Sequence, residues 1–250
     1  MTLALYLPRS SPLHRLHPLA KTVGLAALFL AAFVSDSVVR AALLFVLVGA
    51  LIRLGDVQAN AYRLRWLLGL VFFMTWLVWS LFLRTEGPWV EFGPLHPSAE
   101  SVRLGLAMAL RILTFFTLGL LFLSTTRMEE FAYALRTLGV PAKVAFTFTL
   151  AFRLVPAFVE AALTVVDAQR CRGFDPAEGR WWQRLRNYAL VIVPVFVGAL
   201  RRADGMAMAL EGRGFQRRGP RTSYLRYPWR AADTGAILVA LTVVTTWAVW

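Results

Sequence analysis

Five long apolar segments constrain this fold more than any other feature of the sequence. They cover residues 19–34, 38–52, 66–83, 104–124 and 236–250. A helix that crosses a bilayer needs about 20 mostly apolar residues, so these segments are long enough, or nearly long enough, to span one. Hydrophobic residues make up 58% of the 250-residue chain, which is atypical of a soluble domain. We therefore predict an all-α, polytopic membrane protein with about five transmembrane helices.

The positive charge is concentrated on one predicted side of the membrane. The formal net charge is +13, and 17 of the 27 Lys and Arg residues fall between residues 127 and 230, where eight acidic residues occur. The predicted loop at 85–101 instead carries Glu86, Glu91 and Glu100. Because basic residues mark the cytoplasmic side, we predict a multi-pass protein of the cell membrane with a cytoplasmic N-terminus and an external C-terminus. Membrane lipids then explain the basic charge, and no nucleic-acid partner is expected.

Residues 127–230 differ from the flanking segments because their apolar residues recur on one helical face. Amphipathic helices are predicted at 128–138, 142–172 and 182–213, and Pro156 is expected to bend the second. The apolar run at 188–200 has only about thirteen residues, too few for a crossing, and is placed on the cytoplasmic side. The chain thus divides into N-terminal transmembrane helices (1–126), cytoplasmic-side amphipathic helices (127–230) and a C-terminal transmembrane helix (231–250).

An arginine-glycine-phenylalanine phrase occurs twice, each time at the end of a predicted amphipathic helix. The copies are Arg172-Gly173-Phe174, preceded by Cys171, and Arg213-Gly214-Phe215, preceded by Gly212. A glycine after the last helical residue is an ordinary helix stop, and a cation in the last turn suits the helix dipole. Either copy alone would therefore be interpreted as an ordinary helix C-cap. Because the phrase is repeated in the most basic part of the chain, we interpret the two arginines as a docking surface.

The sequence lacks the motifs of catalysis and cofactor binding. It contains no phosphate-binding glycine loop, no His-Glu-x-x-His zinc motif and no Gly-x-Ser-x-Gly elbow. His14, His17 and His96 fall in predicted loops and are interpreted as surface residues, while the single Cys171 offers no metal-binding spacing. We therefore expect this chain to be no enzyme and to hold no cofactor and no metal.

Arg111 lies inside the fourth apolar segment, where an ionisable side chain is costly. It is either a functional residue or, in the interpretation we favour, an arginine near the interface that is held by a carbonyl or a lipid phosphate. A stand-alone secondary transporter or channel would need a midplane site of broken helices or paired charges. Arg111 is the main candidate for such a site, so this alternative has little support in the sequence.

Several short segments together resemble the T component of energy-coupling factor transporters, the CbiQ/EcfT-like family, over nearly the whole chain. Each segment is a weak signal, but their order and spacing are specific. They are Leu16-His17-Pro18-Leu19-Ala20-Lys21, Thr125-Thr126-Arg127 followed by Glu129-Glu130, Leu138-Gly139-Val140-Pro141, Phe152-Arg153-Leu154-Val155-Pro156, Ala168 to Phe174, and Ala203-Asp204 through Phe215.

The resemblance implies a scaffold subunit of a vitamin or metal-ion importer. Its expected partners are two ABC-type ATPase subunits and a small substrate-binding membrane subunit. Family members end two coupling helices in Ala-Arg-Gly motifs that insert into the ATPases. By position these motifs fall on Cys171-Arg172-Gly173 and Gly212-Arg213-Gly214, each departing from the family at the first residue; Pro156, Ala168, Asp204 and Glu211 are expected to support the coupling helices.

Overall fold

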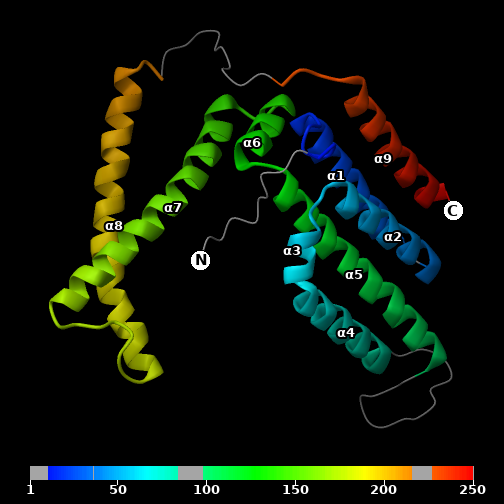
Figure 1. Ribbon diagram of the computed structural model, residues 1–250, viewed down its shortest axis with the longest axis horizontal. Helices are drawn as coiled ribbons and strands as arrows, with labels where there is room; N and C mark the ends of the chain where they lie inside the picture. Colours follow the sequence, from blue (N-terminus) through cyan, green and yellow to red (C-terminus); the bar gives the residue numbers. More distant parts are fainter. Residues whose placement is uncertain (1–10, 36, 84–97, 216–226, 250) are drawn as a thin grey trace. The chain divides into compact units, whose positions relative to one another are not determined.

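The computed structural model describes residues 11–35, 37–83, 98–215 and 227–249, and these parts are all-α, as predicted. Their helices, shown in Figure 1, are α1 (Pro18–Val34), α2 (Val38–Leu54), α3 (Gln58–Arg63), α4 (Arg65–Phe82), α5 (Ala99–Thr125), α6 (Met128–Thr137), α7 (Ala142–Cys171), α8 (Trp181–Gly212) and α9 (Ala231–Val249). The chain divides into two compact units. The first is Met1–Pro141 with Tyr227–Trp250, and the second is Ala142–Arg226. The helix α6 therefore packs with the first unit rather than with α7 and α8.

In the first unit the long helices alternate in direction. The starts of α1 and α9 meet where the His17 backbone N–H donates to Asp233 (2.7 Å), so these two helices run in parallel. The end of α5 lies at the start of α1, since Lys21 donates to the Thr125 carbonyl (3.2 Å). Near its own start, α5 meets the end of α4 through Ser101 and the Ser80 carbonyl (3.0 Å). This alternation is the one that five consecutive crossings by α1, α2, α4, α5 and α9 require.

The core of the first unit lies where α1, α2 and α5 meet. Its buried residues are Leu28, Ala31, Ala32, Leu44, Val48 and Leu118, and residues of α9 pack against them. The rings of Phe29 and Phe115 stack at its edge with centroids 5.3 Å apart. Alanines at the contact let the helices approach closely. In a bilayer the hydrophobic effect does not drive helices together, so close van der Waals packing of this kind stabilises their association.

The closest approach between α4 and α5 is at Gly105. A Cβ atom at this position would lie 2.6 Å from Ser80 Oγ and 3.2 Å from the Trp76 carbonyl oxygen. Ser101, one turn earlier on α5, is fully buried and donates its hydroxyl to the Ser80 carbonyl. Small residues at four-residue spacing on α5 therefore form the contact with α4.

Replacing Gly105 by leucine is expected to separate α4 from α5. The added side chain meets backbone atoms that cannot move aside, so overpacking should cost about 1–3 kcal/mol or more. A lowered midpoint of thermal unfolding in detergent measures the effect. Gly119→Leu is the matched control, because a Cβ on this α5 glycine meets no atom within 4 Å. Equal midpoints for the two variants would contradict the close contact.

The start of α5 corrects one boundary of the sequence analysis. The irregular loop was predicted to reach residue 101, but α5 begins at Ala99. Ser98 and Ser101 form a reciprocal capping box, in which each side-chain oxygen accepts the other residue's backbone N–H (3.0 and 2.8 Å), and this stabilises the first turn. The rest of that loop, including Glu86, Glu91 and His96, lies outside the described residues.

Three described helices, α4, α5 and α7, are long and apolar enough to cross a membrane by length and composition alone. The helices α1 and α9 are apolar but shorter by the same measure, and α2 has 17 residues. The sequence analysis anticipated α4 and α5 as spans and placed α7 on the cytoplasmic side. By length and composition α7 could equally lie within the bilayer.

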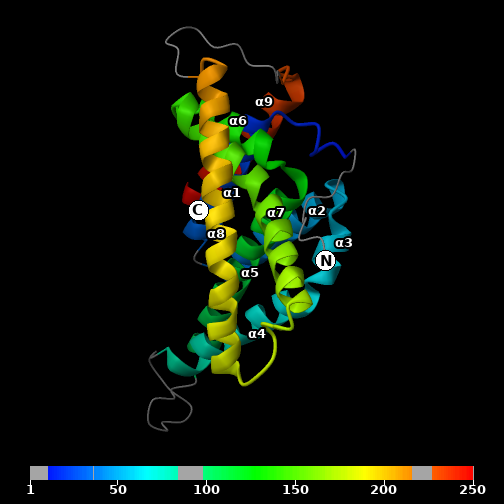
Figure 2. The same ribbon diagram turned by 90° about the vertical axis from the view of Figure 1, so that its left-hand side faces the viewer.

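The second unit is a hairpin of two long antiparallel helices. In Figure 1 the helices α7 and α8 cross, and in Figure 2 they lie beside each other. The start of α7 meets the end of α8, where the rings of Phe146 and Phe215 pack with centroids 4.6 Å apart. The helix α7 continues through Pro156, which the sequence analysis expected to bend it.

Candidate functional site

The first arginine phrase closes α7 with a Schellman motif. Gly173 has a positive φ of 79°, which a glycine adopts without strain. The Phe174 N–H donates to the Gln169 carbonyl and the Gly173 N–H to the Arg170 carbonyl, both at 3.0 Å. Arg172 is therefore held as the last residue before the chain reverses direction.

The second phrase closes α8 with the same geometry. Gly214 has a φ of 71°, the Phe215 N–H donates to the Leu210 carbonyl (2.9 Å) and the Gly214 N–H to the Glu211 carbonyl (2.8 Å). Arg213 thus occupies the same place as Arg172. The two phrases are alike in backbone conformation as well as in sequence.

The end of a third helix, α6, shows which residue of the repeated phrase serves only to stop the helix. The chain leaves α6 through Gly139, with a φ of 99°, and the Val140 N–H donates to the Leu135 carbonyl (3.1 Å). Here the residue before the glycine is Leu138 rather than an arginine. The glycine stop is therefore general in this chain, and the arginine is what distinguishes the ends of α7 and α8.

Arg172 and Arg213 lie at opposite ends of the hairpin, and both are exposed. Within the parts of the chain that the structure describes, neither guanidinium pairs with a carboxylate. The helix α7 has 30 residues and is therefore roughly 45 Å long, at about 1.5 Å per residue. The distance between the two arginines is of this order. The hairpin therefore presents two distant cationic ends rather than one patch.

The turn after Arg172 is held by a small polar network. Arg170 pairs with Asp175 (3.4 Å), and the Asp175 carboxylate accepts the Ala177 backbone N–H (2.9 Å). That backbone hydrogen bond and the charge of Arg170 hold the pKa of Asp175 below its usual range, although partial burial opposes them. The ionised carboxylate thus orders the turn beside Arg172.

Replacing Asp175 by alanine is expected to loosen this turn without unfolding the hairpin. The Ala177 amide loses its acceptor, so its hydrogen exchange should become several-fold faster, whereas Glu178→Ala should leave it unchanged. Because the folded pKa of Asp175 is lowered, its contribution is present at neutral pH and is lost as the pH falls below about 3.9. Slow exchange at Ala177 in the Asp175 variant would contradict this role.

At the other end of the hairpin, a groove of about 450 Å³ lies between α7 and α8. Its apolar lining includes Phe146, Leu150, Leu154, Met206 and Leu210. Three arginines, Arg153, Arg202 and Arg213, also line it. The Arg213 end thus combines an apolar surface with positive charge, a combination suited to a partner that supplies both a carboxylate and an apolar side chain.

The predicted support residues are spread along the hairpin rather than gathered at one site. Pro156 and Asp204 are exposed within α7 and α8. Ala168 is exposed one turn before Arg172, and Glu211 lies in the last turn of α8, two residues before Arg213. Only Ala168 and Glu211 are therefore close in sequence to a motif arginine.

Both hairpin helices expose an apolar stripe, here called the platform faces. The residues recur at helical spacing, Phe148, Phe152, Val155, Val159 and Leu163 on α7 and Trp181, Leu185, Tyr188, Ile192 and Phe196 on α8, each at least 44% exposed. Contiguous exposed apolar surface of this kind marks a contact with a membrane or a protein partner.

The first unit contains a polar junction that the sequence analysis missed. Lys21 donates to the His14 carbonyl (2.9 Å) and pairs with Glu130 (2.9 Å), and the Lys21 side chain is only 6% exposed. His17, interpreted as a surface residue, is buried because its ring packs against Trp229 (4.9 Å) and other aromatic rings. The available signal was the position of Lys21 at the start of an apolar segment, where a buried charge needs a partner.

Arg111 is held by a backbone carbonyl, the interpretation that the sequence analysis favoured. Its guanidinium donates to the carbonyl of Ser35, the C-cap residue of α1. The bond satisfies a carbonyl at a helix end and joins α5 to the connection between α1 and α2. Arg111 thus has a structural role in the fold.

The sequence matches the family model of CbiQ, described as a cobalt transport protein, over residues 9–224. Similar proteins include the energy-coupling factor transporter transmembrane protein EcfT of Thermosediminibacter oceani, 32% identical over 95% of this chain and 93% of that protein. The EcfT protein of Limosilactobacillus fermentum is 28% identical over 95% and 92%. A Bifidobacterium longum protein named as an ABC transporter ATP-binding protein is 31% identical over 92% of this chain but only 30% of its own length.

Proposed function

The chain belongs to the CbiQ family of membrane transport proteins, and on that premise we propose that it is the coupling subunit of an energy-coupling factor importer. In this role it transmits ATP-driven motion from two ABC-type ATPases to a small substrate-binding membrane subunit. The imported substrate is a vitamin or a transition-metal ion. ATP hydrolysis belongs to the partner subunits, and this chain is a scaffold rather than an enzyme.

The observation that carries the proposal is the pair of matching helix ends. Arg172 and Arg213 have the same backbone setting at the two ends of one hairpin. A guanidinium is permanently charged and can bind a carboxylate through two donors, so each end suits an acidic groove on one ATPase. Two distant ends on continuous helices fit two ATPases whose relative movement must be transmitted.

The Bifidobacterium relative supports an ATPase partner. A segment similar to this chain makes up 30% of a protein named for ATP binding, so that protein joins a segment of this kind to an ATP-binding part in one polypeptide.

The platform faces of α7 and α8 support the second proposed partner, the small substrate-binding membrane subunit. Their exposed aromatic and aliphatic side chains suit an apolar membrane subunit that sits on the hairpin.

The distribution of charge supports a cytoplasmic position for the hairpin and the N-terminus. Basic residues are concentrated on the side of the first unit where α1 and α9 begin and where α2 and α5 end. They include Arg15, Lys21, Arg53, Arg63, Arg65, Arg127 and Arg230. The opposite ends of these helices carry fewer, among them Arg40 and Arg103. By the positive-inside rule, this distribution favours a cytoplasmic location for the first set.

Affinity purification of the tagged chain from its own cells tests the proposal. ABC ATPases and a small membrane protein should co-elute in detergent, and mass spectrometry of the complex should identify a bound vitamin or metal ion. The alternative, a stand-alone secondary transporter or channel, would use Arg111 as a midplane charge, but Arg111 donates to the Ser35 carbonyl. Substrate transport by the purified chain alone in liposomes would overturn the proposal in favour of that alternative.

A further inference from the structure

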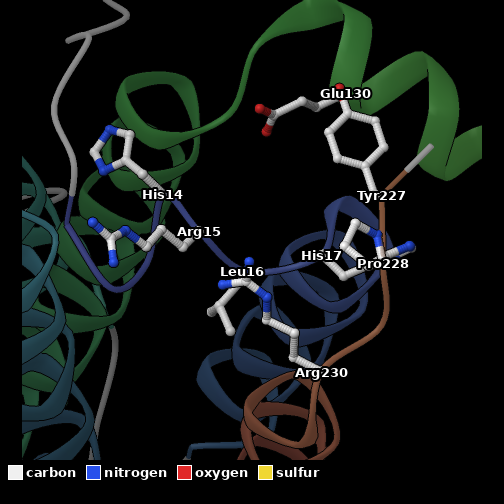
Figure 3. A pocket seen from close by; sticks show the side chains of 8 residues that line it. All are labelled: His14, Arg15, Leu16, His17, Glu130, Tyr227, Pro228 and Arg230. Carbon is white, nitrogen blue, oxygen red and sulfur yellow. The ribbon is translucent and has the colours of Figure 1, made fainter. Parts of the chain in front are cut away.

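Two cavities of different character, one with a mixed lining and one with an apolar lining, adjoin in the first unit. A pocket of about 340 Å³, here called the polar pocket, has His14, Arg15, Leu16, Glu130, Tyr227 and Arg230 among its lining residues (Figure 3). An apolar cavity of about 300 Å³ is lined by leucines and small residues of α1, α2, α5 and α9. Each volume is at the lower end of the range of ligand sites, about 300–1,000 Å³.

Lys21 and Leu16 connect the two cavities. Leu16 lines both of them. Lys21 lines the apolar cavity, while its ammonium binds the His14 carbonyl and the Glu130 carboxylate, which both belong to residues of the polar pocket. The two cavities thus adjoin at Leu16 and Lys21, and a single molecule with a polar end and an apolar end matches the character of the pair.

The polar pocket has an excess of positive charge. The Glu130 charge is already paired with Lys21, at 2.9 Å. Both oxygens of the buried Asp233 are used by the backbone N–H groups of His17 and Arg230, at 2.7 Å each. The guanidinium groups of Arg15 and Arg230 remain to bind an anion. Arg15 lies in the segment before α1 and Arg230 in the segment before α9, and both residues line the pocket (Figure 3).

Tyr227 adds a hydrogen-bond donor to this pocket. Burial raises the pKa of Tyr227, and the negative charges of Glu130 and Glu129 raise it further, so the phenol stays protonated at neutral pH. The lining of this pocket thus includes two guanidinium groups and, on the α6 side in Figure 3, a phenol O–H, and donors of these kinds suit the oxygens of a phosphate group.

We propose that these two cavities form one binding site for a phospholipid with an anionic headgroup. The phosphate binds Arg15 and Arg230 in the polar pocket, and one acyl chain lies in the apolar cavity between α1 and α9. Both helices begin on the side of the unit where basic residues are concentrated, which is where anionic headgroups bind basic pockets between membrane helices. The lipid would then join α9 to α1 and α5.

Native mass spectrometry of the purified chain with equal amounts of phosphatidylglycerol and phosphatidylcholine tests the headgroup. Wild-type protein should retain phosphatidylglycerol preferentially. The double substitution Arg15→Ala, Arg230→Ala should lower its retention about twenty-fivefold, since each arginine contributes about 1 kcal/mol, or a factor of about five. Arg53→Ala, Arg63→Ala is the matched control, because both arginines are exposed on the same side but line neither cavity. Equal retention of the two lipids, or no loss in the Arg15 and Arg230 variant, would overturn the proposal.

The acyl-chain part of the site has its own test. A Cβ atom added at Gly24, which lines the apolar cavity, meets nothing within 4 Å, so Gly24→Leu should fill the cavity without disturbing the fold. We expect this variant to lose bound lipid of either headgroup, while Gly49→Leu, also in open space but outside the cavity, keeps it. Excess inorganic phosphate should not release the lipid. Release by phosphate, or full retention in Gly24→Leu, would show that the cavities do not act as one site.

Discussion

Replacing Arg172 and Arg213 together by alanine is expected to abolish stable association with the ATPase subunits. Truncating one partner of a buried, hydrogen-bonded charge pair at an interface costs about 2–5 kcal/mol, which is at least tenfold in affinity for each end. The two ends lie far apart on the hairpin, so their effects should add. Co-purification of the ATPases and substrate uptake by the assembled transporter measure the loss.

Lysine substitutions separate charge from geometry at these two positions. Arg172→Lys and Arg213→Lys keep the positive charge but lose the planar fork, so partial binding with weakened coupling is expected. Arg201→Ala is the matched control, since Arg201 is an exposed arginine of α8 that lies away from both helix ends. Wild-type ATPase yield and normal uptake in the double alanine variant would exclude the docking role.

The three helices predicted at 128–138, 142–172 and 182–213 begin and end within one residue of the predicted positions. Local signals determine these ends. Gly139, Gly173 and Gly214 each take a positive φ directly after a helix, where a side chain would be strained. Because the helix stop depends on its own few residues, the sequence is enough to locate it. The same local character explains why the two arginine phrases were recognisable before their geometry was known.

The polar junction of the first unit could not be predicted in this way. His17 meets Asp233, 216 residues later, and Lys21 meets Glu130, 109 residues later. A position in a predicted loop indicates exposure only when no other segment returns to cover it. Here the segment before α9 covers His17 with Trp229 and Tyr227, so the histidine is buried. The separation of the two arginine ends likewise depends on how α7 and α8 pair, which no local pattern contains.

Replacing Lys21 by alanine should destabilise the first unit more than any other single change of a polar residue there. The substitution leaves the Glu130 carboxylate, which is 14% exposed, without its cation, and removes the donor to the Thr125 carbonyl at the end of α5. Breaking a buried ion pair by deleting one partner costs about 3–5 kcal/mol. The expected result is a clearly lower midpoint of thermal unfolding and a poor yield from detergent.

The second lysine of the chain and the acidic partner give the controls. Lys143→Ala removes an exposed charge and should change the midpoint little. The double variant Lys21→Met, Glu130→Gln leaves no unpaired charge, so it should be more stable than Lys21→Met alone, with a coupling energy of the sign expected for an ion pair. If the two substitutions were simply additive, the ion pair would be unimportant. The ties of Lys21 to the His14 and Thr125 carbonyls would then account for the whole effect of its removal.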